Sequence, residues 1–319
     1  MKRMIAGASL TALLAAAAAP AQTVKVEAGV PSYQKASGVS GSFSSIGSDT
    51  MNNLMTLWGE AFAKMYPNVK IQVEGKGSST APPALISGTA QFGPMSRAMR
   101  ASEIDQFEKK YGYKPTQLRT SYDALAVYVN KDNPLEKATV AQIDGAFSKT
   151  RRKGGKNAAR WGDLGLTGDW AARPLSLYGR NSASGTYGFF KENVLGNGDF
   201  KDTVKEQPGS ASVVQGVTED RFGIGYSGIG YKTSGVKLVS LEGKGGVSDG
   251  SYADIVSGKY PLARFLYVYV NRAPGKPLDP VVREFLKLVF SREGQEIVLK
   301  DGYYPLPAKV VQEELAKVR

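Results

Sequence analysis

The chain has 319 residues, more than one hydrophobic core usually organises, so two lobes are expected. Its net charge of +12 with 42% hydrophobic residues is typical of a soluble globular protein. The sequence has no interleaved basic and aromatic motifs, so the excess of positive charge favours a small anion over nucleic acid as the binding partner. The absence of Cys and His excludes disulfides, thiol chemistry and His-based triads, and we expect no cofactor and no metal site.

The N-terminus has the pattern of a processing segment. Lys2 and Arg3 precede an apolar stretch at 5–19, which ends in small residues. This predicts a signal peptide over 1–21, export, and a mature protein that begins near Gln22. Residues 22–40 are small and polar without a sustained period, so we expect a flexible lead-in and folded structure from about Gly41. No other stretch is long and apolar enough to span a bilayer.

The first half predicts alternating strands and helices. The segment 41–47 alternates as a strand, and a helix follows that Pro67 ends. The apolar face of that helix is Met51, Leu54, Met55, Trp58, Phe62 and Met65. Further strands are predicted at 69–73 and 91–95, with a short helix at 82–87 between them.

The second half repeats this theme after a polar helix at 102–111 and an apolar strand at 125–129. Strands are predicted at 175–178, 222–226 and 265–270, helices after the loops at 182–186 and 209–212, and a buried helix at 280–290 that packs back onto the first lobe. Two apolar runs end in the same VYVN, which suggests that the chain crosses between lobes twice. The basic insert at 151–160 is expected to be a solvated loop.

Four loops rich in small hydroxyl residues and glycine precede helices. They are GSDT at 47–50, GSST at 77–80, SASGT at 182–186 and GSAS at 209–212, two in each half. A helix start has unpaired backbone N–H groups and a partial positive charge, so it attracts an oxyanion. A single loop of this kind is more often just a capped helix. Their duplicated order predicts a buried anion held between two lobes.

A desolvated oxyanion needs many hydrogen-bond donors. The hydroxyl candidates are Ser48, Thr50, Ser78, Ser79, Ser184 and Thr186. Gly77 and Gly185 allow close backbone approach, and Arg180 can offer its planar guanidinium. Arg97 is either a ligand or a structural salt-bridge residue, whereas Tyr226 and Ser227 are expected to line the cleft.

Selectivity for phosphate requires a hydrogen-bond acceptor as well. A buried carboxylate accepts a proton from protonated phosphate and repels sulfate, which has none to give. Asp49 is our candidate, with a plain N-cap as its alternative role. Asp123 is the weaker alternative acceptor.

These motifs, together with RNSASGT, GKGSST, QFGPMSR and FGIGYSGIGY, resemble the PstS-type phosphate-binding proteins of bacterial ABC importers over nearly all of the mature length. The resemblance implies phosphate contacts from Ser78, Arg180, Ser184, Gly185 and Thr186 and from the 49–50 segment. Some members place an acceptor Asp where this chain has Ser96 followed by Arg97, so the acceptor role is unassigned and Asp49 is a replacement for it. The full candidate set is Ser48, Asp49, Thr50, Ser78, Ser79, Ser96, Arg97, Arg180, Ser184, Gly185 and Thr186.

The resemblance also implies an α/β fold of the type 2 periplasmic-binding-protein class, with two mixed sheets flanked by helices and joined by a two-strand hinge. Lobe I is expected at 41–123 plus 264–319 and lobe II at 124–263. The implied function is capture of inorganic phosphate in the periplasm by a monomer, and delivery to the permease and ATPase subunits of an inner-membrane ABC importer. Two alternatives stay open: a secreted scavenging or adhesion protein without a transporter, and a phosphatase that uses a Ser nucleophile.

Overall fold

The computed structural model describes residues 24–318, so the predicted signal peptide lies outside the described residues. The strands are β1 (Gly41–Gly47), β2 (Val69–Gly75), β3 (Gly93–Met95), β4 (Thr116–Asn130), β5 (Lys137–Thr139), β6 (Ser176–Arg180), β7 (Lys205–Gln207), β8 (Gly223–Gly228), β9 (Val236–Leu238), β10 (Ser240–Gly243), β11 (Gly246–Ser248) and β12 (Ala263–Val270). The α-helices are α1 (Asn52–Met65), α2 (Ala81–Ser87), α3 (Ala101–Tyr111), α4 (Val140–Phe147), α5 (Gly185–Asn193), α6 (Ser210–Glu219), α7 (Tyr252–Val256), α8 (Pro280–Val289), α9 (Arg292–Lys300) and α10 (Ala308–Ala316). Short 3-10 helices are η1 (Asp49–Met51), η2 (Ser78–Thr80), η3 (Trp161–Leu164), η4 (Gly168–Trp170) and η5 (Ile229–Tyr231). Across 24–318, no helix combines the length and apolar character needed to traverse a bilayer.

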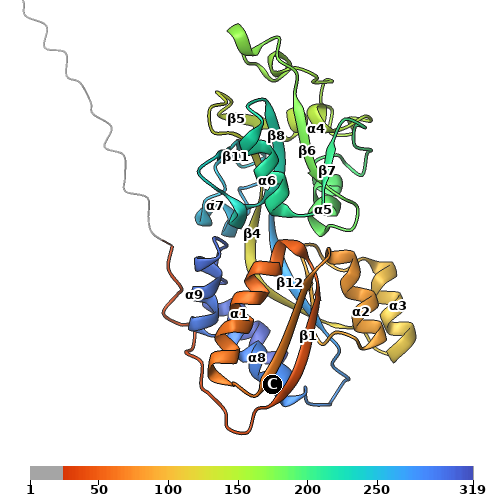
Figure 1. Cartoon of the computed structure of the whole chain (residues 1–319), viewed down its shortest axis with the longest axis vertical. Coiled ribbons are helices and arrows are strands. Elements are labelled where there is room, and N and C mark those ends of the chain that lie inside the picture. The colour runs from red at the N-terminus through yellow and green to blue at the C-terminus, as the bar shows by residue number, and fades with distance from the viewer. Residues whose placement is uncertain (1–23, 319) are drawn as a thin grey trace, which may run out of the picture.

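Two strands connect an upper and a lower lobe. In Figure 1, β4 and β12 run between the lower lobe, with α1, α2, α3, α8 and α9, and the upper lobe, with α4, α5, α6 and α7. They pair with each other antiparallel in a mixed sheet of order β3-β12-β4-β8-β6-β7, with β9 also on β4. β1 and β2 form a parallel pair in the lower lobe, and β11-β10-β5 form a small sheet in the upper one. The predicted α/β class and the double crossing are confirmed.

Aromatic side chains fill the lower core. Phe43 on β1 lies 4.7 Å, centroid to centroid, from Phe285 on α8, and Phe62 on α1 packs on the same ring at 5.5 Å. The return of 280–290 onto the first lobe is therefore confirmed. The upper lobe has its own core, in which Phe190 on α5 stacks on Tyr226 of β8 at 3.9 Å. Each lobe thus buries a separate apolar face and holds its loops rigidly.

Residues 24–40 differ from the expected flexible lead-in. They contain no helix or strand, yet Val30 is only 2% exposed and belongs to the lower core. The Arg292 N–H donates to Pro31 O at 2.8 Å, and the hydroxyls of Tyr33 and Tyr66 are 2.7 Å apart. These anchors are spaced irregularly, so no periodic pattern reveals them. The basic loop at 151–160 is largely exposed, as predicted.

Asp301, directly after α9, gives the lower lobe a pH-dependent stability. Burial raises the pKa of Asp301 to about 6, against an opposing hydrogen bond from Asn53, and Asp301 Oδ2 is buried without a hydrogen-bond partner. The folded state holds this proton more tightly than the unfolded state, so stability falls as pH rises from the unfolded value of 3.8 towards 6. We expect Asp301→Asn to raise the thermal unfolding midpoint at about pH 7.5 and to have little effect near pH 4. A midpoint difference that does not change with pH in calorimetric scans would contradict this.

Candidate functional site

The four Ser/Gly loops meet between the lobes. The Oγ1 atoms of Thr50 and Thr186 are 2.8 Å apart, and the Ser79 N–H donates to Ala183 O at 3.1 Å. The Ser210 N–H at the start of α6 donates to Asp49 Oδ2 at 2.8 Å. Each of these contacts joins a loop of the lower lobe to a loop of the upper lobe. The predicted convergence is confirmed.

Two glycines make this close approach possible. A Cβ on Gly185 would lie 2.3 Å from Ser78 Oγ and 2.6 Å from Ser96 Oγ. Gly77 has a φ of +112°, and a Cβ there would lie 2.5 Å from Ala183 O. Any larger residue would hold the loops apart, so glycine at these positions sets the width of the site.

Arg180, the last residue of β6, lies inside the site. It is 1% exposed, its Nη1 donates to Ser210 Oγ at 2.6 Å, and its Nη2 donates to Pro208 O at 3.1 Å. Nη1 also forms an ion pair with Asp49 Oδ2 at 3.0 Å. Its Nε is buried and has no hydrogen-bond partner. Burial lowers the pKa of the Arg180 guanidinium, and the nearby Asp49 carboxylate opposes that shift. The site therefore holds a buried donor group with one N–H still to be satisfied.

Asp49 does not cap the helix that follows it, so the N-cap alternative is wrong. Neither Ser48 nor Asp49 makes a side-chain capping bond at η1; the Asp49 carboxylate instead caps α6 in the other lobe through the Ser210 N–H. The Tyr231 hydroxyl donates to Asp49 O at 2.9 Å and holds this turn in place. Asp49 thus brings a negative charge to Arg180 across the cleft.

Sequence reasoning missed Arg264, at the start of β12. Arg264 is buried, and its Nε and Nη2 donate to Asp123 Oδ2 at 2.8 and 2.7 Å. Its Nη1 donates to Ser96 O at 2.8 Å and its Nη2 to Thr186 Oγ1 at 3.0 Å. The sequence offered one signal for this pair: Asp123 and Arg264 are single opposite charges beside the two apolar runs that became β4 and β12. Arg264 ties both crossing strands to loops of the two lobes.

The Asp123 carboxylate already accepts three hydrogen bonds within the protein. It is 0% exposed, Oδ2 takes both Arg264 bonds, and Oδ1 accepts from the Ile229 N–H at 3.0 Å. A further acceptor role for Asp123 is disfavoured by this geometry, which leaves Asp49 as the carboxylate beside the loops.

The remaining candidates divide into donors and supports. The Ser96 N–H donates to Ser78 Oγ at 3.0 Å, which places both hydroxyl residues beside Gly185. Ser184 Oγ accepts from the Thr186 and Tyr187 N–H groups at 3.1 and 3.3 Å, so it caps α5. The buried backbone N–H of Ser48 donates to Pro94 O at 2.8 Å and fixes the first loop.

Arg97 forms a structural salt bridge. Its two terminal nitrogens donate to the Glu103 carboxylate at 2.8 and 2.7 Å, and Nη2 lies 3.5 Å from Ser79 Oγ. Tyr226 was expected to line the cleft but is fully buried in the upper core, where its hydroxyl accepts from the Arg180 N–H at 3.2 Å. The result is a centre of hydroxyl, N–H and guanidinium donors with one carboxylate, which suits a partly protonated tetrahedral oxyanion.

Comparisons with known proteins identify the family and the fold of this chain. Residues 32–293 match the model of a PBP superfamily domain. The chain is similar to the phosphate-binding protein PstS of Pseudomonas aeruginosa, at 55% identity over 100% of this chain and 99% of that protein. It is also similar to a PstS of Staphylococcus haemolyticus, at 30% identity over 86% and 84% of the two chains. Among solved structures, a candidate phosphate ABC transporter substrate-binding protein from Clostridium perfringens shares the fold, with a TM-score of 0.71, 23% identity, and coverage of 83% of this chain and 100% of that one.

Proposed function

Because the chain belongs to the PBP superfamily, and within it to the PstS-type phosphate-binding proteins with their two-lobed type 2 fold, we propose that it captures inorganic phosphate between its lobes and delivers it to an ABC importer. The observation that carries the proposal is the buried Arg180, whose Nε has no partner at the point where four donor-rich loops meet. No bond is made or broken in this function.

The ligand set follows from where donors converge. The hydroxyls come from Thr50, Ser78, Ser96 and Thr186, and Arg180 contributes its Nε. The start of α5 contributes the backbone N–H of Gly185, whereas the Ser79 N–H is already bonded to Ala183 O. Ser48 and Ser184 hold their loops in place, and Arg97 steadies Ser79. Helix starts add favourable potential for an anion without adding full charges.

Asp49 is proposed to select phosphate over sulfate. Its Oδ2 is held by Arg180 and by Ser210 N–H, which orients the carboxylate across the cleft. In that orientation it accepts a hydrogen bond from a protonated phosphate oxygen and repels a fully deprotonated oxyanion.

Replacing Asp49 with Asn is expected to reduce the ratio of phosphate to sulfate affinity by about tenfold or more, because one acceptor and one repulsive charge are removed. Equilibrium binding of radiolabelled phosphate, with sulfate as competitor, measures that ratio. Asp132→Asn, on an exposed turn after β4, makes the same change of charge away from the cleft and serves as the control. An unchanged ratio in the Asp49 variant would remove Asp49 from the selectivity role.

Transport requires release as well as capture. We propose that lobe I (41–123 plus 264–319) and lobe II (124–263) separate on β4 and β12 at the transporter, which parts the loops and frees the ion. The proposed partners are the permease and ATPase subunits of an inner-membrane importer, reached after export to the periplasm by the signal peptide at 1–21. A monomer is consistent with the surface, where Val247 and Val256 are the large hydrophobic side chains exposed among residues 24–318.

A phosphatase is the less favoured function. Its nucleophile would be Ser184, but Ser184 Oγ accepts two backbone N–H groups at the start of α5, and the chain has no His to act as a base. We therefore propose that the protein is not an enzyme, in keeping with relatives that are named as phosphate-binding proteins.

A further inference from the structure

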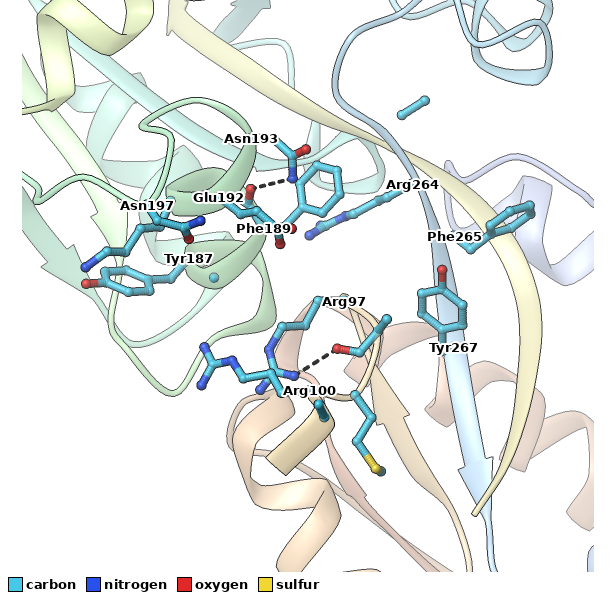
Figure 2. Close-up of a pocket in the computed structure, with 16 residues that line it drawn as sticks. Arg97, Arg100, Tyr187, Phe189, Glu192, Asn193, Asn197, Arg264, Phe265 and Tyr267 are labelled. Carbon is cyan, nitrogen blue, oxygen red and sulfur yellow. Dashed lines mark hydrogen bonds between the residues drawn. The ribbon is translucent and has the colours of Figure 1, made fainter. Parts of the chain in front are cut away.

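A cavity lies between the lobes beside the loops described above. It has a volume of about 640 Å³ and three walls: the segment after β3, with Arg97 and Arg100; α5, with Gly188 and Lys191; and β12, with Arg264. Figure 2 shows Arg97 and Arg100 on one side of the opening and Arg264 on another, with Tyr187 on the α5 side. Arg264 separates this cavity from Thr186, to which its Nη2 donates.

The lining is cationic. The lining contains four basic residues, Arg97, Arg100, Lys191 and Arg264. It contains one carboxylate, that of Glu192. Glu103 and Asp123 balance Arg97 and Arg264, but neither belongs to the lining. Arg100 is exposed, and Lys191 forms an ion pair with the exposed Asp199 at 3.3 Å. Four basic residues and one acidic residue line the cavity, so cationic donors outnumber carboxylates at its surface.

One buried donor in this wall is unsatisfied. Arg97 is 7% exposed, and its Nε is buried without a hydrogen-bond partner. A Cβ on Gly188 would lie 3.5 Å from that Nε and 3.4 Å from Arg100 Nη2. Both guanidinium groups thus reach across from the lower lobe to the surface of α5, and glycine at 188 leaves their N–H groups uncovered.

The two sites differ in the room they offer. Around Gly185 the loops touch, with Thr50 and Thr186 hydroxyls 2.8 Å apart, so an organic substituent does not fit there. The cavity of about 640 Å³ holds roughly twenty water volumes, which leaves space beyond one phosphoryl group. The aromatic rings of Tyr187 and Phe189 provide an apolar surface for such a substituent.

We propose that this cavity is a second oxyanion site, weaker than the first, which binds a phosphoryl group. That group is either inorganic phosphate or the phosphate end of a small monoester, and it binds while the loops around Arg180 are occupied. The donors of this second site are Arg97 Nε, Arg100 and Lys191. Arg264 forms the wall between the second site and the first. The site goes beyond the proposed transport function, because it places a second ligand on the closed protein.

The test uses the full mature chain loaded with one equivalent of orthophosphate. In one arm, labelled glycerol 3-phosphate is added and binding is measured by equilibrium dialysis; in the other, labelled orthophosphate is added beyond the first equivalent. We expect a second, weaker binding event in at least one arm. The double variant Arg100→Gln with Lys191→Gln should weaken this event about tenfold or more and leave uptake of the first equivalent unchanged.

The matched control removes two positive charges from the exposed basic loop, as Arg152→Gln with Lys153→Gln. It should leave the second event unchanged. A second event in the orthophosphate arm alone supports the oxyanion site and identifies the free ion as its occupant; one in the ester arm supports the monoester. No second event in either arm, or equal losses in both double variants, would overturn the proposal. If the unmutated protein failed to bind the first equivalent of orthophosphate, that result would instead contradict the proposed function.

Discussion

Replacing Arg180 with Ala is expected to weaken phosphate binding by about a hundredfold or more. The variant removes the buried guanidinium whose Nε is unsatisfied and leaves Asp49 without its ion-pair partner, so a repulsive carboxylate stays beside the anion. The lost charge-assisted hydrogen bond contributes about 1.5–3 kcal/mol and the repulsion from Asp49 adds to it, and each 1.4 kcal/mol corresponds to about tenfold in affinity. Isothermal titration calorimetry with orthophosphate measures the change.

Arg173→Ala is the matched control, because Arg173 is exposed in the same lobe and stacks on Phe222 at 5.4 Å, away from the loops. It should bind phosphate as the unmutated protein does. Thermal unfolding of both variants separates a folding defect from a binding defect, and Arg180→Lys, which keeps the charge, should fall between the two. Binding by folded Arg180→Ala within about threefold of the unmutated protein would show that Arg180 is no ligand.

Replacing Gly185 with Ala is expected to lower phosphate affinity by about tenfold or more, because the added Cβ would lie 2.3 Å from Ser78 Oγ and 2.6 Å from Ser96 Oγ. Both clashes are with the opposite lobe, so they oppose closure and do not disturb the packing of α5 itself. Calorimetry should show the loss of affinity. Small-angle X-ray scattering with saturating phosphate should show a larger radius of gyration than for the unmutated complex.

Gly188→Ala provides the comparison on the same helix. Its Cβ would come no closer than 3.3 Å to a neighbour, Arg97 Cδ, so phosphate affinity should be nearly unchanged. Equal effects of the two substitutions would mean that the helix, and not the contact between lobes, determines affinity.

Local patterns predicted much of this molecule. The apolar period from Met51 to Met65 begins at the end of η1 and continues through α1, and Pro82 lies in the first turn of α2 as the spacing indicated. The four loops were predicted as a group because each is a short motif before a helix. Their convergence required only that the two lobes meet at these loops. Such features are encoded within a few residues, so they are visible without the fold.

The missed features depend on contacts between distant segments. The contacts of Asp49 across the cleft were not predicted: its Oδ2 is held by Arg180 and Ser210, more than 130 residues away in sequence. Arg264 meets Asp123 because β12 and β4 pair antiparallel in that register. Register and crossing geometry follow from the whole sheet, and no local pattern specifies them.

These contacts suggest how binding energy is coupled to movement. The loops that we propose to hold the anion are the same loops that join the lobes, so their donors converge only when the lobes meet. Phosphate then binds the closed state more tightly than the open one, and closure excludes water from Arg180. A transporter that separates the lobes weakens all of these contacts together.

A crystal structure of the mature protein grown with orthophosphate tests the central claim most directly. We predict one tetrahedral anion within hydrogen-bond distance of Arg180 Nε and of residues from both lobes, among them Ser78 and Thr186, with the Asp49 carboxylate facing it. An anion bound elsewhere, or an Arg180 Nε that stays without a partner in crystals soaked with phosphate, would contradict this account.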